Sequence, residues 1–172
     1  MHILIDGYNL IRQSAHLRHF ERQSLEAGRH ALIAFLSGYQ KRKGHKITVV
    51  FDGWVSGPPL EERDLSAGIH LIYSRRGEKA DEVIKRMAAH AEEEMLVVTS
   101  DREIASYAAR KDRAVLSSAE FEAIAENASS PAENLMEKDE DDEETDRSVR
   151  KKGAAHKLSR AQRRTQACVR KL

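Results

Sequence analysis

The chain has 172 residues, of which 40% are hydrophobic and 33% are charged. A chain of this length suits one domain and leaves little room for a second full core. Its formal net charge is +1, from 29 Lys and Arg against 28 Asp and Glu, which excludes a strong overall field that would draw the molecule to nucleic acid. The single cysteine, Cys168, excludes an intrachain disulfide and any zinc site built from several cysteines.

The sequence shows neither a membrane span nor an export signal. No run approaches the ~18 apolar residues that a bilayer span needs. The first residues, Met1–Asp6, contain neither a basic segment nor a small-residue cleavage site, so no secretory signal is expected. We therefore expect a cytoplasmic protein without membrane association.

Charge is distributed unevenly along the chain. Residues 1–127 hold 18 basic and 19 acidic residues, the mixture of a globular domain. Residues 137–146 hold eight acids and one lysine, whereas residues 147–172 hold ten bases and no acid. Blocks of like charge repel internally and favour disorder. We expect a domain over residues 1–127, an acidic disordered linker over residues 128–146, and a basic tail over residues 147–172 that is disordered or partly helical.

Within the expected domain, short apolar runs indicate buried strands. They lie at residues 3–5, 47–51, 69–73, 96–99 and 114–116. Helical spacing covers residues 25–43, which end at Gly44, and residues 80–91. Two capping-box patterns open further helices, Ser100 with Glu103 and Ser117 with Glu120. Apolar strands that alternate with helices are typical of a parallel sheet covered on both faces, so the sequence predicts an α/β fold, a three-layer sandwich around a mostly parallel sheet.

An aspartate follows three of the expected strands, namely Asp6 and Asp52 directly and Asp101 after Ser100. The carboxyl ends of parallel strands share one edge of the sheet, where open α/β folds bind ligands. Asp81 opens the helix after the third strand, so a right-handed crossover can bring it to the same edge. Carboxylates gathered there would repel one another unless a cation binds among them, and hard oxygen ligands suit Mg²⁺ or Mn²⁺. Such an ion can activate water and stabilise charge on a phosphoryl oxygen.

Each aspartate also has a purely structural interpretation. An Asp-Gly pair after a strand, as at Asp6 and Asp52, is a common turn. Asp81 and Asp101 would lie in the first turn of a helix, where the helix dipole favours any acid. Four independent turns and caps need not share one edge of a sheet, so their coincidence favours a site.

The segments around these aspartates resemble a known family. They read IDGYNL at residues 5–10, VFDG at 50–53, KADEVI at 79–84 and VTSDRE at 98–103. In this order and spacing they resemble the YacP-like branch of the NYN domains, which belong to the PIN-like nuclease superfamily. The resemblance covers about residues 1–127 and leaves the tail outside.

The resemblance implies a metal-dependent endoribonuclease that hydrolyses phosphodiester bonds in single-stranded RNA. Some relatives are ribosome-associated, so mRNA on the ribosome is the expected substrate. Carried over by motif, Asp6, Asp81 and Asp101 would be catalytic carboxylates of a Mg²⁺ or Mn²⁺ site, with Asp52 as a further ligand. Asn9 matches an edge position where its amide could orient a water or a phosphate.

Several other side chains could hold the nucleic acid. Arg75 and Arg76 lie just before Asp81, where cations suit a phosphate backbone, although the same loop could simply be solvated. Arg102 could contact phosphate or pair with a neighbouring acid. Trp54 could stack on an unpaired base or cover the edge of the core.

Two questions stay open at this point. The basic tail could bind RNA, including ribosomal RNA, as an electrostatic arm, or it could fold back on the acidic linker. The chain could also be a catalytically inactive RNA-binding module of the same fold. Other classes fit less well, because a receiver domain needs a paired acid where Gly7 stands and a haloacid-dehalogenase-type phosphatase needs an aspartate in place of Tyr8.

Overall fold

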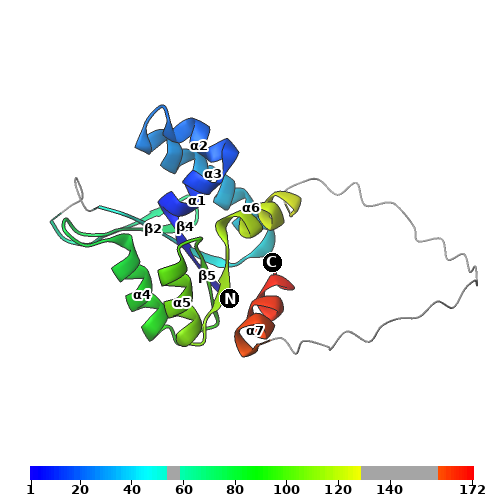
Figure 1. The fold of residues 1–172 in the computed structure, drawn as a ribbon. Coiled ribbons are helices and arrows are strands. Elements are labelled where there is room, and N and C mark those ends of the chain that lie inside the picture. The colour runs from blue at the N-terminus through cyan, green and yellow to red at the C-terminus, as the bar shows by residue number, and fades with distance from the viewer. Residues whose placement is uncertain (54–58, 129–158) are drawn as a thin grey trace, which may run out of the picture.

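A computed structural model describes residues 1–53, 59–128 and 159–172. These residues form one six-stranded sheet in the order β3-β4-β2-β1-β5-β6 (Figure 1). The strands are β1 (His2–Asp6), β2 (Lys46–Phe51), β3 (Glu62–Ser66), β4 (Ile69–Tyr73), β5 (Met95–Val98) and β6 (Ala114–Leu116). Every neighbouring pair is parallel except β3 with β4, which confirms the mostly parallel sheet. Trp54 and residues 129–146 of the expected linker lie outside the described residues.

Helices cover both faces of this sheet. One face carries α1 (Gly7–Gln13), α2 (Ala15–Glu21), α3 (Leu25–Lys43) and α6 (Ser118–Asn127), and the other carries α4 (Ala80–His90) and α5 (Arg102–Arg110) (Figure 1). Successive side chains of a strand point to opposite faces, so Ile3 and Ile5 join the core under the first group and Leu4 joins the core under the second. The three-layer architecture is therefore confirmed.

Three elements escape the sequence prediction, namely α1, α2 and β3. The edge strand β3 is exposed and mostly polar, so it lacks the apolar run that indicates a buried strand. The helices α1 and α2 have seven residues each, too few for a helical period to stand out. One predicted cap is wrong, because Asp101 rather than Ser100 caps α5. The capping box of Ser117 and Glu120 is confirmed at the start of α6.

The end of the basic tail forms α7 (Arg160–Val169), which packs against the edge strand β6. The Thr165 hydroxyl accepts a hydrogen bond from Val115 N (3.2 Å) and donates one to Val115 O (3.1 Å). One side chain thus satisfies backbone groups that a further strand would have paired. Lys171 Nζ lies 2.5 Å from Oε1 of Glu94, so this described part of the tail forms an ion pair with an acidic residue of the domain.

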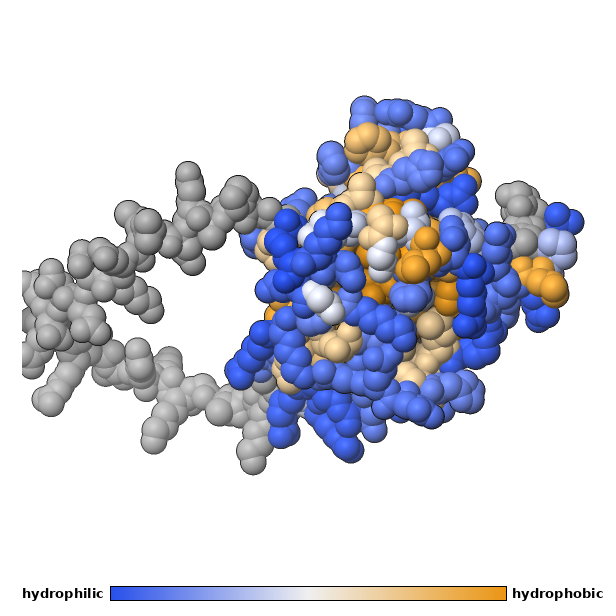
Figure 2. All heavy atoms as spheres, turned by 180° about the vertical axis from the view of Figure 1, so that it is seen from behind, coloured by the Kyte–Doolittle hydropathy of each residue, from blue (hydrophilic) through white to orange (hydrophobic). Residues whose placement is uncertain are grey.

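The outer surface is mostly hydrophilic. Seen from behind the view of Figure 1, hydrophilic residues cover most of the face and apolar ones show in smaller areas between them (Figure 2). Large hydrophobic side chains that are exposed include Leu25, Leu60 and Leu65, of which Leu25 lines a pocket at the carboxyl edge of the sheet. Within the described ranges, no helix combines the length and apolar character required to cross a bilayer.

Gly7 lets the chain pass from β1 into α1 with the helix close against the sheet. A Cβ at this position would lie 2.5 Å from Cε1 of Phe51 and 2.8 Å from Cγ1 of Val49. Gly7→Ala is therefore expected to lower the free energy of unfolding by about 1–3 kcal/mol, the usual cost of overpacking a core. Urea unfolding followed by circular dichroism measures this change.

Gly38→Ala is the matched control, because Gly38 lies inside α3 and a Cβ there meets Arg42 Nη2 at an ordinary contact distance of 3.6 Å. Alanine in place of a helical glycine is expected to raise stability by about 0.5–1 kcal/mol. If both substitutions changed stability equally, the close packing of α1 on β2 would be contradicted.

Candidate active site

The carboxyl edge of the sheet contains the point where the chain changes direction. From β1 the chain proceeds to β2 and β4 on one side, and it then returns to β5 on the other side of β1. Open α/β sheets bind ligands at such a point, between the carboxyl ends of the two diverging strands. Asp6 is the last residue of β1, and Asp101 follows β5 after Thr99 and Ser100.

A pocket of about 930 Å³ opens at this edge, within the size range of ligand sites. Asp6, Asn9, Asp52, Asp81 and Asp101 all line it, so the structure brings together the side chains expected at one edge of the sheet. Asp6 is buried, Asp81 and Asp101 are half-buried, and Asp52 is exposed. Asp52 therefore differs from the other three carboxylates in being exposed to solvent.

Asp6 is the most buried carboxylate of the pocket. Its Oδ1 accepts a hydrogen bond from Asn9 N (3.3 Å) and thereby caps α1, and its Oδ2 accepts one from the Thr99 hydroxyl (3.2 Å). Burial, with the negative charges of Asp81 and Asp101, raises the pKa of Asp6 to about 6 despite these hydrogen bonds. A carboxylate is thus held where its charge is unfavourable, and a bound cation would relieve this cost.

Asp81 and Asp101 come from the first turn of α4 and the N-cap of α5. Burial and the charge of Asp101 raise the pKa of Asp81 above its ordinary value. Asp101 Oδ1 accepts hydrogen bonds from the backbone N–H groups of Glu103 (2.7 Å) and Ile104 (3.1 Å). Asp6 and Asp101 therefore both cap helices. Their capping hydrogen bonds hold the two carboxylates at the pocket, so capping is compatible with a role in the site.

Asn9 is held by its amide oxygen. Its Oδ1 accepts hydrogen bonds from Ser100 N (2.9 Å) and from the Ser118 hydroxyl (2.8 Å), which uses both acceptor positions. Its Nδ2 makes no hydrogen bond to any part of the chain that the structure describes. The side chain can therefore offer donors to the pocket, which suits a phosphate oxygen or a water better than a metal ion.

The carboxylates have the chemistry of a Mg²⁺ or Mn²⁺ site, although they are not assembled into a cage. Among residues 1–53, 59–128 and 159–172, no group of three His, Cys, Asp or Glu side chains is close enough to hold a metal ion. Mg²⁺ commonly binds one or two carboxylates and keeps several waters, so a preformed cage is not required. Hard oxygen donors around a buried carboxylate with a raised pKa fit such an ion. Asp6 with Asp81 or Asp101 would hold it, directly or through water.

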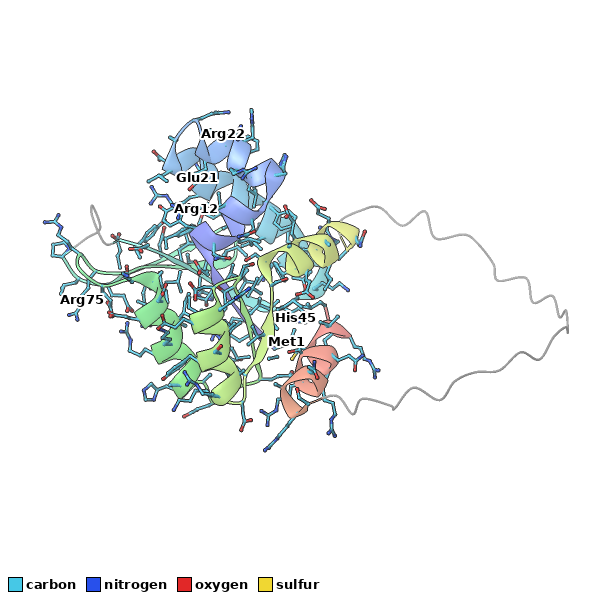
Figure 3. The ribbon with its side chains drawn as sticks, in the orientation of Figure 1. Met1, Arg12, Glu21, Arg22, His45 and Arg75 are labelled. Atoms are coloured by element: carbon cyan, nitrogen blue, oxygen red, sulfur yellow. The ribbon has the colours of Figure 1, made fainter. Side chains whose placement is uncertain are left out.

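The three arginines expected to hold RNA lie outside this pocket, whereas Asn9, expected to orient a water or a phosphate, lines it. Arg75, Arg76 and Arg102 are exposed and do not line it. Arg75 lies in the loop before α4, at the outer edge of the molecule, and its Nε is 3.5 Å from Oε2 of Glu78 (Figure 3). The roles of these arginines, and that of Trp54, stay predictions.

Two cations that line the pocket were not predicted, namely Arg12 from α1 and Arg29 from α3. A further one, Lys79 at the N-cap of α4, ends the basic loop that the sequence places before Asp81. A signal existed for Arg12, which follows Asn9 by three residues and so shares a side of the helix with it. Arg29 carries no such signal, because the position of α3 beside the pocket depends on tertiary packing.

A family model described as the YacP-like NYN domain matches residues 3–170. The chain belongs to the YacP-like NYN domain family. The match continues beyond residue 127, where the motif resemblance ends, and takes in α7. The NYN domain has a PIN-like nuclease fold, which supports a nuclease-type function.

Relatives from one organism agree with this assignment. A Bacillus subtilis (strain 168) protein described as "Uncharacterized protein YacP" is 34% identical over 87 residues, about half of this chain and half of its own (50% each). A crystal structure of Rae1 (YacP) from Bacillus subtilis matches with a TM-score of 0.61 at 28% identity, over 74% of this chain and 75% of that one. A single-residue mutant of the same protein matches with a TM-score of 0.62 at 25% identity, over 74% and 76%.

Proposed function

We propose that this NYN domain is a divalent-metal-dependent endoribonuclease that hydrolyses phosphodiester bonds in single-stranded RNA. The observation that carries the proposal is the set of three carboxylates, Asp6, Asp81 and Asp101, that line one pocket where the sheet changes direction. Burial and mutual repulsion raise the pKa of Asp6 to about 6, a cost that Mg²⁺ or Mn²⁺ would remove. The nuclease fold of the family supports the same class of reaction.

Each side chain of the pocket has a distinct part in this proposal. When bound, Mg²⁺ or Mn²⁺ supplies an activated water and stabilises charge on the scissile phosphate. Asp6 offers a carboxylate whose position two hydrogen bonds define. Asp81 and Asp101 add the negative charge that favours a cation, and Asp52 is an exposed outer ligand. Asn9 Nδ2 donates to a phosphate oxygen, since Oδ1 is already occupied.

Incubating the purified chain with single-stranded RNA tests the proposal. We expect internal cuts with Mn²⁺ or Mg²⁺, because the activated water depends on the ion, and we expect no cuts in excess EDTA. RNA labelled at either end distinguishes internal cuts from trimming, and single-stranded DNA of the same sequence measures the preference for RNA. Readdition of Mn²⁺ after EDTA is the control and is expected to restore cleavage.

A catalytically inactive RNA-binding module of the same fold is the competing hypothesis. It predicts RNA affinity that survives EDTA, together with no cleavage in either metal. That combination would replace the nuclease proposal.

We extend the proposal to mRNA on the ribosome as the substrate, on the basis of the resemblance to ribosome-associated relatives. Co-sedimentation of the purified chain with ribosomes tests this part separately from catalysis. A chain that cuts free RNA and stays out of the ribosome fraction at low salt would restrict the proposal to free RNA.

A further inference from the structure

Two arginines and three aromatic rings form a continuous row beside the carboxylates. The Arg12 guanidinium lies 5.4 Å from the centroid of the Tyr8 ring, and the Arg29 guanidinium lies 5.6 Å from that of Tyr73. Between them, Phe51 contacts Tyr8 edge-on (5.2 Å between centroids) and stacks on Tyr73 (5.6 Å, 21° between planes). Phe51 is fully buried in the core, so the rings give both guanidinium groups a rigid support.

These guanidinium groups keep most of their donors for a ligand. Arg29 is half-buried and makes no hydrogen bond or ion pair within the described residues. Arg12 uses Nε for Glu21 Oε1 at 3.2 Å, beside which it lies in Figure 3. Arg12 and Arg29 both line the pocket that holds the carboxylates. A guanidinium fixed by a ring and left with unused N–H groups is suited to bind phosphate oxygens.

The negative charge of the pocket also requires cations that can hold the phosphates of a nucleic acid. The carboxylates at the edge of the sheet repel a nucleic-acid backbone, and the β3 part of the wall adds Glu62 and Asp64. Cations of the wall that hold phosphates next to the reacting one offset this repulsion. Arg12 and Arg29 place such cations on the α1 and α3 side of the pocket.

We propose that Arg12 and Arg29 form a phosphate subsite, which holds the backbone of the RNA substrate along α1 and α3 next to the carboxylates. The inference rests on the proposed function for the nature of the polyanion. The subsite differs from the arginines expected from the sequence, since Arg75 and Arg76 do not line this pocket.

Salt-dependent binding of a fluorescently labelled single-stranded RNA tests the subsite, measured by anisotropy on the full chain in EDTA, where no cleavage is expected. Arg12→Gln and Arg29→Gln are each expected to weaken binding about tenfold at low salt. Each is also expected to reduce the slope of log Kd against log salt concentration by about 0.7, the value for one phosphate contact on a single strand. The double variant is expected to lose about 1.4 of the slope.

Arg18→Gln is the matched control, because this substitution removes the same charge. Arg18 is exposed on α2 and does not line the pocket. Glu62→Gln is a second control with the opposite sign, and we expect binding to stay equal or to tighten. Equal urea midpoints for all variants would show that the fold, including the packing around the three aromatic rings, is intact.

The subsite is rejected if Arg12→Gln and Arg29→Gln have the slope of Arg18→Gln, or if Glu62→Gln weakens binding. This outcome is distinct from failure of the proposed function. A chain that cuts RNA with Mn²⁺ but shows no change in slope keeps the nuclease and loses the subsite. A chain whose slope changes as expected but that never cuts RNA keeps the subsite and loses the nuclease.

Discussion

Asp6→Asn and Asp81→Asn are each expected to reduce metal-dependent RNA cleavage by about two to three orders of magnitude while the chain stays folded. Asparagine keeps the shape of aspartate and is an equally good helix cap, so Asp6→Asn still accepts the hydrogen bond from Asn9 N at the start of α1. The substitution removes only the charge that would hold the ion. Initial cleavage rates at saturating Mn²⁺ measure the loss, and circular dichroism reports the fold.

Glu82→Gln is the control for this experiment, because Glu82 follows Asp81 on α4, carries the same charge and does not line the pocket. We expect its cleavage rate to stay within about twofold of the wild-type rate. Asp52→Asn is expected to have an intermediate effect, since Asp52 lines the pocket but is exposed. Wild-type cleavage rates in both Asp6→Asn and Asp81→Asn would remove the basis of the proposed site.

Asp6→Asn is also expected to make the metal-free chain more stable at neutral pH. The pKa of Asp6 is raised from 3.8 to about 6 in the folded state, chiefly by burial. Between these two values the unfolded chain has released its proton while the folded chain still holds one, so stability falls as pH rises through this window. A shift of this size corresponds to about 3 kcal/mol, which is lost in full above a pH of about 6.

Urea unfolding of both chains in EDTA, between about pH 4 and pH 7, measures this effect. The difference in free energy of unfolding between the wild-type chain and Asp6→Asn reports Asp6 and its coupling to Asp81 and Asp101, since titrating groups elsewhere are common to both. We expect this difference to shift by about 3 kcal/mol in favour of Asp6→Asn across the window, and Mn²⁺ to restore much of the wild-type stability at neutral pH. A difference in free energy of unfolding that does not vary with pH would show that burial does not raise the pKa of Asp6.

Local sequence patterns predict the parts of the fold and site that depend on neighbours in the chain. The runs at residues 3–5 and 47–51 indicate buried strands because the side chains on both faces of a central strand are apolar. Asp6 and Asp52 could be assigned to one edge because parallel strands end on the same side. The edge strand β3 and the short α1 were missed, since neither has enough periodic apolar residues to stand out.

Tertiary packing decides how the pocket is completed, and the sequence could not predict this. The positions of the aspartates at the strand ends follow directly from sheet topology. Predicting them required only the order of the elements along the chain. Arg29 reaches the pocket from α3, and Thr165 reaches the edge of β6 from α7, 50 residues after Val115. These contacts depend on the angle and register at which each helix packs, and these are set by the shapes of many distant side chains together. The sequence alone therefore determined the α/β sheet and its acidic edge, whereas only the tertiary structure decided that Arg29 stands beside the acids.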